Sequence, residues 1–218
     1  MARPIEKMVT VPAPDEAAGA LEAIFLPAEG PARGAAVVAP PHPLYGGSMD
    51  NPVVGEVAYA CQELGLASLR FNWRGVGAST GEASGDPDEA ARDYRAALEQ
   101  AAETAPGELL AAGYSFGAVA ALAAAASPAL PRPVTRLLLV APPPALLPSD
   151  AFAGVSAPVL VVTGAADPLA PPAELSRLLG DCPGARLEVI PRADHFFGAG
   201  LGELRRVILD ALGEGDAG

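Results

Sequence analysis

The chain has 218 residues and half of them are hydrophobic, which excludes a disordered protein and suits one domain with a sizeable core. Acidic residues outnumber basic ones by 26 to 14, and the net charge of −12 argues against nucleic acid or an anionic membrane as the main partner. The sequence has neither a signal-peptide pattern nor an unbroken apolar stretch of about 18 residues. We therefore expect a cytoplasmic protein without a membrane span.

The cysteine and histidine contents argue against metal chemistry. Cys61 and Cys182 lie far apart and outside any C-x-x-C spacing, so we expect both to be buried, unreactive thiols. The two histidines, His42 and His195, have no carboxylates around them at the spacing of metal ligands. We therefore expect no metal and no cofactor.

Apolar runs alternate with helical patterns along the chain. The first two runs predict the strands of a hairpin, and the unbroken run at 34–40 is typical of a strand buried in a parallel sheet. We expect strands at residues 8–13, 21–28, 34–40, 66–73, 108–114, 134–141, 157–164 and 185–191.

Helix signals follow most of these strands. Asn51 and Asp86 are N-cap residues, each followed by a proline, and Glu89 is placed to form a capping box with Asp86. We expect helices at 52–64, from 87 onward, and at 116–127, 171–180 and 201–213. This alternation predicts a single α/β domain over residues 1–218, with a mainly parallel sheet and helices on both faces.

Two stretches match the G-x-S-x-G pattern of serine hydrolases, at 113–117 and 77–81. Ser115 stands directly between a predicted strand and a predicted helix, where a nucleophile elbow requires the serine to be. Ser79 lies in a long loop with no helix directly after it, and it is interpreted as a turn residue. Because ligands bind at the carboxyl ends of strands in such sheets, Ser115 is the candidate nucleophile.

The candidate base and acid also follow strands. His195 comes after the strand at 185–191 and downstream of the serine. This matches the chain order of serine, Asp or Glu, and histidine that accompanies a nucleophile elbow. Asp167 follows the strand at 157–164, whereas Asp150 follows the preceding strand at a longer distance and is the weaker alternative. The remaining histidine, His42, precedes the serine and is interpreted as a residue that orients its loop.

A tetrahedral oxyanion requires two backbone N–H donors. One is expected from Phe116, the residue after the nucleophile, and the other from the loop after the strand at 34–40. Prolines have no N–H, so three residues of this loop can donate: His42, Leu44 and Tyr45. Of these we favour Leu44.

With these motifs in place, the chain resembles small bacterial α/β-hydrolases that have no cap, a group of predicted hydrolases or carboxylesterases similar to dienelactone hydrolases in fold. The matching stretches extend over nearly the whole chain and are PPHPLYGGSMDNPVV, LRFNWRGVGASTGE, AAGYSFGAVAA, VTGAADPLAP and ADHFF. The resemblance implies Ser115, Asp167 and His195 as a catalytic triad. A dienelactone hydrolase would carry cysteine as nucleophile. Pro40 and Trp73 stand where relatives often have histidine and phenylalanine.

Only sixteen residues, 142–157, separate two strands where larger hydrolases insert a lid, so we expect an open, shallow site. The apolar residues that we expect around the site, besides Leu44 and Phe116, are Tyr45, Trp73, Leu169 and Phe196. The sequence therefore predicts a serine hydrolase that cleaves small carboxylic esters. A thioesterase or amidase with the same triad, or a binding protein that keeps the fold without catalysis, are the alternatives.

Overall fold

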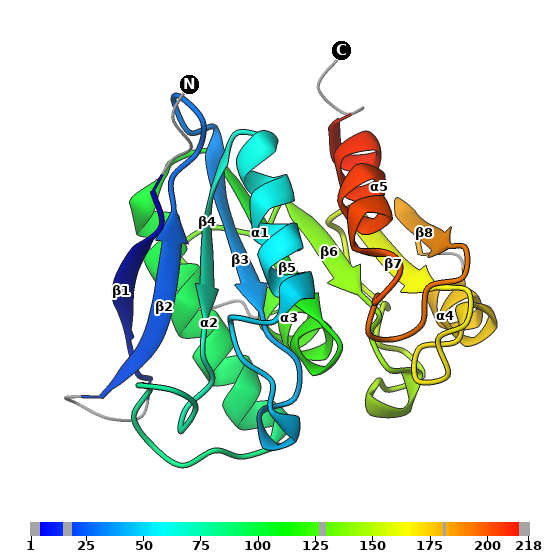
Figure 1. The fold of residues 1–218 in the computed structure, drawn as a ribbon, viewed down its shortest axis with the longest axis horizontal. Coiled ribbons are helices and arrows are strands. Elements are labelled where there is room, and N and C mark those ends of the chain that lie inside the picture. Colours follow the sequence, from blue (N-terminus) through cyan, green and yellow to red (C-terminus); the bar gives the residue numbers. More distant parts are fainter. Residues whose placement is uncertain (1–4, 15–18, 127–129, 181, 214–218) are drawn as a thin grey trace.

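An eight-stranded sheet runs through the middle of the structure, a computed structural model that describes residues 5–14, 19–126, 130–180 and 182–213. The strands lie in the order β1-β2-β4-β3-β5-β6-β7-β8 (Figure 1). Their bounds are β1 (Lys7–Pro12), β2 (Ala20–Leu26), β3 (Gly34–Ala39), β4 (Leu66–Phe71), β5 (Glu108–Tyr114), β6 (Arg136–Val140), β7 (Val159–Gly164) and β8 (Ala185–Ile190).

The first two strands form the predicted hairpin, in which Lys7 pairs with Phe25. Strand β2 is antiparallel to β4 as well, and from β4 to β8 all neighbours are parallel. The carboxyl ends of these six parallel strands therefore meet at one edge of the sheet, which is the edge where an α/β sheet binds ligands.

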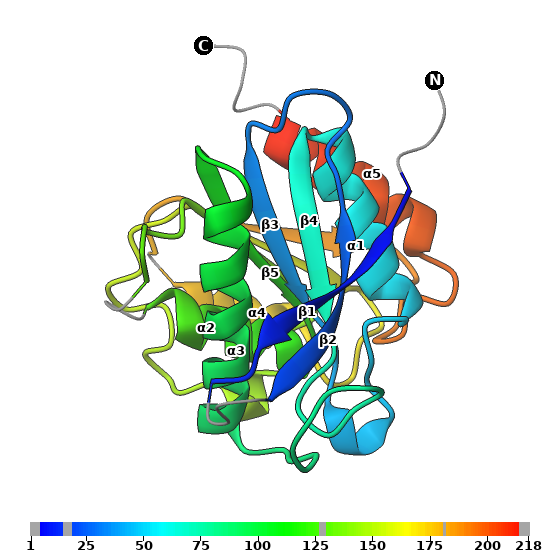
Figure 2. The same ribbon diagram turned by 90° about the vertical axis from the view of Figure 1, so that its left-hand side faces the viewer.

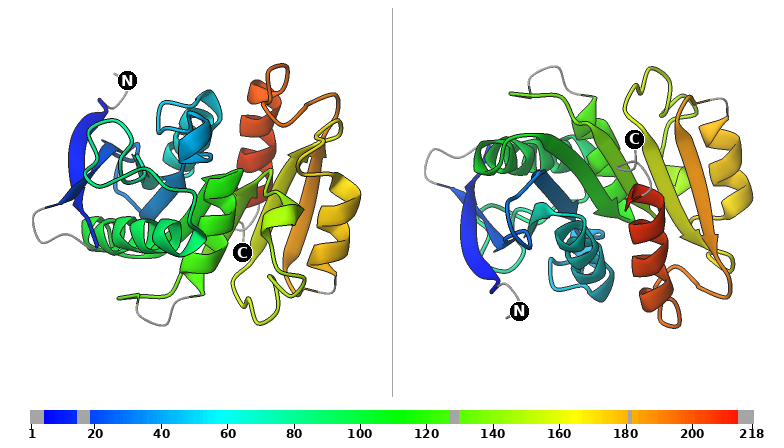
Figure 3. Two further views of the ribbon diagram at one scale, coloured as in Figure 1. Left: turned by 90° about the horizontal axis from the view of Figure 1, so that it is seen from below. Right: turned by 90° about the horizontal axis from the view of Figure 1, so that it is seen from above.

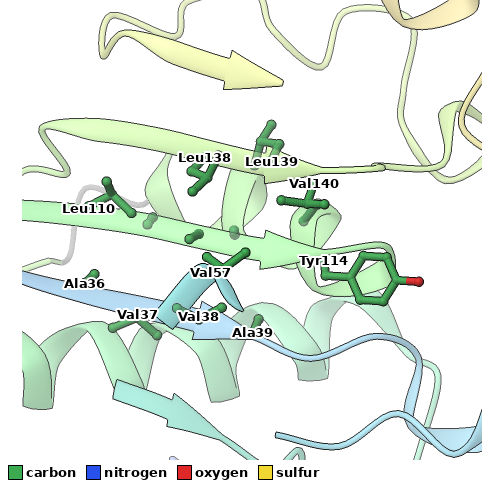
Figure 4. Close-up of a cluster of buried hydrophobic side chains, with 14 of the residues drawn as sticks. Ala36, Val37, Val38, Ala39, Val57, Leu110, Tyr114, Leu138, Leu139 and Val140 are labelled. Atoms are coloured by element: carbon green, nitrogen blue, oxygen red, sulfur yellow. The ribbon is translucent and has the colours of Figure 1, made fainter. Parts of the chain in front are cut away.

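In the part of the chain that the structure describes, five helices cover the two faces of the sheet. Helices α1 and α5 lie on one face, and α2, α3 and α4 lie on the other (Figures 2 and 3). Their bounds are α1 (Pro52–Glu63), α2 (Pro87–Thr104), α3 (Phe116–Ala125), α4 (Pro172–Leu179) and α5 (Leu201–Gly213). Because both faces are covered, every residue of β3, β4 and β7 is buried, and Figure 4 shows the apolar cluster around β3, β5 and β6. The predicted α/β fold is therefore confirmed.

The predicted N-caps are present. The Asn51 side chain accepts a hydrogen bond from the N–H of Val53, and Asp86 accepts from Asp88 and Glu89. The prediction that Glu89 completes a capping box is wrong. Its carboxylate accepts hydrogen bonds from Arg74 and from the Ser84 hydroxyl instead of from the N–H of Asp86. The predicted helix end at residue 127 lies outside the described residues.

Two short connections shape the carboxyl edge of the sheet. A single 3-10 turn, η1 (Pro43–Tyr45), follows β3, and another, η2 (Pro144–Leu146), follows β6. Between β6 and β7, residues 141–158 contain η2 and no longer helix, so no lid is inserted there. In the described residues no helix has both the length and the apolar character needed to cross a bilayer.

Candidate active site

Ser115 occupies a sharp turn between β5 and α3. Its backbone has φ 55° and ψ −121°, a conformation that costs energy for any residue with a side chain. The turn is tight: a Cβ at Gly113 would lie 2.2 Å from the carbonyl oxygen of Gly117, and one at Gly117 would lie 2.4 Å from that of Pro40. Glycine is therefore required on both sides of the serine, as the elbow pattern predicts.

The three predicted polar side chains meet at the carboxyl edge of the sheet. The Ser115 Oγ lies 3.0 Å from His195 Nε2, and His195 Nδ1 lies 2.8 Å from Asp167 Oδ2. All three residues are buried, with 9%, 4% and 4% of their surface exposed. The relay therefore joins side chains from the ends of β5, β7 and β8 in a site largely shielded from water.

The loop after β7 fixes the orientation of Asp167. Its Oδ1 accepts hydrogen bonds from the N–H groups of Leu169 and Ala170, both at 2.8 Å, which leaves Oδ2 for His195. The Thr163 hydroxyl closes this loop by donating to the carbonyl oxygen of Ala170 at 2.8 Å. Burial alone would raise the pKa of Asp167, but the hydrogen bonds from His195 and the two N–H groups outweigh it and lower that pKa.

The loop after β8 is held against the elbow by Tyr114. The Tyr114 hydroxyl donates to the carbonyl oxygen of His195 at 2.8 Å, and Figure 4 shows its side chain at the end of β5. Burial raises the pKa of Tyr114, so the hydroxyl keeps its proton and remains a donor. This contact could not be predicted from the sequence, because Tyr114 occupies a variable position of G-x-S-x-G and nothing in the sequence marks its partner.

The weaker candidates for acid and nucleophile lie elsewhere. Asp150 is exposed in the segment between β6 and β7. Asp194, the carboxylate next to His195, accepts from the N–H of Phe196 in its own turn. The Ser79 hydroxyl accepts from the N–H of Glu22 and donates to the carbonyl oxygen of Asn72, so it pins a loop, as a turn residue does.

The cysteines differ in their surroundings. Cys61 is fully buried, and burial raises the pKa of its thiol to about 12, so it is unreactive. Cys182 is partly exposed, contrary to the prediction that both would be buried. No cluster of three or more His, Cys, Asp or Glu side chains in the described part of the chain is arranged to hold a metal.

The three candidates for the second oxyanion donor differ in the hydrogen bonds that their N–H groups make. The N–H of Leu44 donates to His42 Nδ1 at 3.2 Å, and the N–H of Tyr45 donates to the carbonyl oxygen of His42 at 3.1 Å. Both donors are therefore engaged within η1. The N–H groups of His42 and Phe116 donate no hydrogen bond within the described part of the chain. Of the three candidates, Leu44 and Tyr45 thus have an engaged N–H, and the N–H of His42 is free.

The predicted apolar residues divide into two groups. Tyr45, Leu169 and Phe196 are 87%, 53% and 73% exposed, on the loops after β3, β7 and β8 that surround Ser115, and Leu44 is 58% exposed beside them. Trp73 does not line this surface. It is 1% exposed, because its Nε1–H donates to the carbonyl oxygens of Pro40 and Pro41 and its ring packs edge-on against Phe71 and Phe116.

Comparisons with known proteins agree with this fold. Residues 46–153 match a family model described as serine aminopeptidase, S33. An α/β serine hydrolase homologue from Coxiella burnetii is 30% identical, with a TM-score of 0.83 over 94% of this chain and 97% of its own. XC6422 from Xanthomonas campestris, described as an α/β serine hydrolase without lid, is 34% identical, with a TM-score of 0.80 over 96% of this chain and 94% of its own.

A dienelactone hydrolase from Anabaena variabilis is 25% identical, with a TM-score of 0.74 over 95% of this chain and 96% of its own. The fold of the present chain, and the residues at the carboxyl ends of its parallel strands, define an α/β protein of the hydrolase type. The chain belongs to the α/β-hydrolase superfamily.

Proposed function

We propose that the protein is a serine hydrolase that cleaves small carboxylic esters through an acyl-enzyme intermediate. The observation that carries the proposal is the relay from Ser115 Oγ through His195 to Asp167, with distances of 3.0 Å and 2.8 Å. Both distances are within the range in which a nucleophile, its base and the residue that orients the base act together. The strained backbone of Ser115 supports the same role.

In the proposed mechanism, the Ser115 Oγ attacks the carbonyl carbon of the ester while its proton passes to His195 Nε2. Asp167 Oδ2 accepts the Nδ1–H of His195, which fixes the tautomer and stabilises the imidazolium. The tetrahedral intermediate collapses when the imidazolium gives its proton to the departing alcohol. A water molecule then attacks the acyl-enzyme, with His195 again as the base, and releases the acid and the free serine.

The negative oxygen of the tetrahedral intermediate is proposed to accept hydrogen bonds from the N–H groups of Phe116 and His42. Both are without a partner among the described residues, and Phe116 is the first residue of α3, where helix N–H groups are unpaired and the helix dipole is positive. The exposed side chains of Tyr45, Leu169 and Phe196 are proposed to contact the apolar parts of the substrate.

The experiment combines active-site labelling with substrate panels. A fluorophosphonate should label the protein at Ser115, and hydrolysis should be fastest for p-nitrophenyl esters, compared with acyl thioesters and with aminoacyl p-nitroanilides. The anilides test the activity that the name of the matching family model suggests. Labelling with faster thioester or anilide cleavage would replace the ester proposal. The absence of both labelling and hydrolysis would favour a binding protein.

A further inference from the structure

We propose that the His42 side chain is a positioning residue for the oxyanion hole, because it holds the loop after β3 in the conformation that leaves the His42 N–H free. This inference rests on the proposed function. The loop is rich in proline: Pro40, Pro41 and Pro43 have no N–H. The His42 N–H is therefore the first donor after β3.

The η1 turn engages the donors that follow. The carbonyl oxygen of His42 accepts from the N–H groups of Tyr45 and Gly47, at 3.1 Å and 3.0 Å. The N–H of Gly46 donates to the carbonyl oxygen of Pro43 at 3.3 Å, and that of Leu44 donates to the Nδ1 of the His42 side chain at 3.2 Å. Without an acceptor on this side chain, the N–H of Leu44 would be free as well, and the turn would lose its cap. His42 thus determines which of the three candidate N–H groups stays unbonded.

The orientation of the His42 N–H follows from the peptide unit that contains it. The carbonyl oxygen of Pro41 belongs to the same peptide and accepts the Nε1–H of the buried Trp73 at 3.0 Å. This peptide is trans, so its N–H points in the direction opposite to its carbonyl. The His42 N–H therefore points away from the buried indole. A hydrogen bond to the carbonyl of a peptide also polarises its N–H, which strengthens it as a donor.

The His42 ring connects this loop to the other proposed donor. Its centroid lies 4.7 Å from that of Phe116 and 4.6 Å from that of Tyr45. On a further side it meets Gly85, where an added Cβ would lie 2.6 Å from His42 Nε2. Burial lowers the pKa of His42, which keeps the imidazole neutral and its Nδ1 an acceptor at neutral pH.

The test compares two variants of nearly equal shape. Both His42→Leu and His42→Asn remove the ring, but only asparagine carries an oxygen that can accept from the N–H two residues later. Full loss of an oxyanion donor lowers kcat by about 10²–10³-fold, so loss of its positioning should lower it less. In His42→Leu we expect kcat for p-nitrophenyl acetate to fall by about 10- to 100-fold with KM changed less than about threefold. His42→Asn should recover at least about tenfold of that loss.

Gly85→Ala provides a second perturbation that leaves His42 in place. The new Cβ must displace the His42 ring, so kcat should fall in the wild-type background and not fall further in His42→Leu. Thermal unfolding of each variant shows whether it is folded. If His42→Leu does not fold, the kcat of Gly85→Ala in the wild-type background tests whether the position of the His42 ring matters.

Three results would overturn the inference: an unchanged kcat in His42→Leu, equal losses in the leucine and asparagine variants, or independent effects of Gly85→Ala and His42→Leu. In each of these cases the wild-type protein still hydrolyses esters and reacts with a fluorophosphonate. A wild-type protein that does neither overturns the proposed function and this inference with it, so the two failures are distinguishable.

Discussion

The Tyr114 hydroxyl donates a hydrogen bond to the backbone carbonyl oxygen of His195 at 2.8 Å. These residues are 81 positions apart: Tyr114 ends β5, His195 follows β8, and β6 and β7 lie between these two strands. The contact therefore joins the residue before the proposed nucleophile to the proposed base. It restrains the position of the imidazole relative to the end of β5, since the carbonyl belongs to the same residue as the ring.

Tyr114→Phe should lower both stability and turnover. The substitution keeps the buried ring and leaves the carbonyl of His195 without its donor, which costs about 1–3 kcal/mol in the free energy of unfolding. We expect kcat for p-nitrophenyl acetate to fall about tenfold with a smaller change in KM, because a displaced imidazole affects the chemical step more than binding. Urea unfolding and steady-state kinetics measure the two effects. A loss of stability with an unchanged kcat would show that the contact is structural alone.

The two G-x-S-x-G serines should respond differently to alanine. Ser115→Ala should abolish fluorophosphonate labelling and lower ester hydrolysis to the residual level that the oxyanion donors and binding provide. Ser79→Ala is the matched control: it loses hydrogen bonds to Glu22 and Asn72, so it should lower the free energy of unfolding by about 1–2 kcal/mol and keep most of the activity. Inactivity of the Ser79 variant with retained activity of the Ser115 variant would refute the assignment.

Asp167→Asn should lower activity far more than it disturbs the loop. The asparagine oxygen can still accept from the N–H groups of Leu169 and Ala170, but its NH₂ group would face His195 Nδ1 and favour the wrong tautomer. We expect a loss in kcat of about 10⁴-fold. Asp194→Asn is the control, because Asp194 accepts from Phe196 in its own turn, and it should retain activity within a few-fold. Equal losses in both variants would contradict the role of Asp167.

The lowered pKa of Asp167 also predicts how the stability of the fold depends on pH. Hydrogen bonds lower the pKa of Asp167 in the folded protein below the value of about 3.9 expected for an unfolded chain. The ionised carboxylate therefore stabilises the fold above about pH 4, and this contribution is lost as the pH falls through the folded pKa. Urea unfolding of the wild type and Asp167→Asn from neutral to acidic pH should show a stability difference that shrinks below about pH 4. A stability difference that grows on acidification would mean that folding raises the pKa of Asp167 instead of lowering it.

Much of the fold could be predicted because its signals are local. The unbroken apolar run of β3, the caps Asn51 and Asp86, and the direct passage from β5 to Ser115 are each readable within a few residues. The rule that functional residues follow strands then selected Asp167 over Asp150. These signals do not depend on how distant segments pack.

The errors concern contacts between distant segments or choices within one turn. Glu89 was expected to cap its own helix, but Arg74 from the loop after β4 takes its carboxylate. Trp73 was expected near the substrate, but its indole finds acceptors more than 30 residues away, at Pro40 and Pro41. Leu44 is the favoured oxyanion donor in the sequence, but its N–H is engaged by the Nδ1 of His42, an acceptor that the sequence does not place.

Short acyl esters should be better substrates than long ones. Residues 141–158 connect β6 to β7 with a single 3-10 turn, so nothing there covers a long acyl chain. The exposed Tyr45 and Phe196 can contact only a few methylene groups, each worth about 0.8 kcal/mol when buried. We expect kcat/KM to rise over the first few carbons and then to level off. The measurement is kcat/KM for p-nitrophenyl esters from acetyl to palmitoyl, below and above the micelle concentration.

Phe196→Ala tests which surface gives this preference. If the exposed ring at Phe196 contacts the acyl group, the variant should lose more of its kcat/KM with the hexanoyl ester than with the acetyl ester. Met8→Ala serves as the control, because Met8 is 61% exposed on β1, which the rest of the sheet separates from β8, and it should leave the ratio of the two esters unchanged. A maximum at twelve carbons or more, or a jump in rate at micelle formation, would contradict the prediction, since either requires a deep channel or a lid. Equal losses with both esters in Phe196→Ala would mean that the ring supports His195, which lies 5.7 Å away between centroids, and does not select the acyl group.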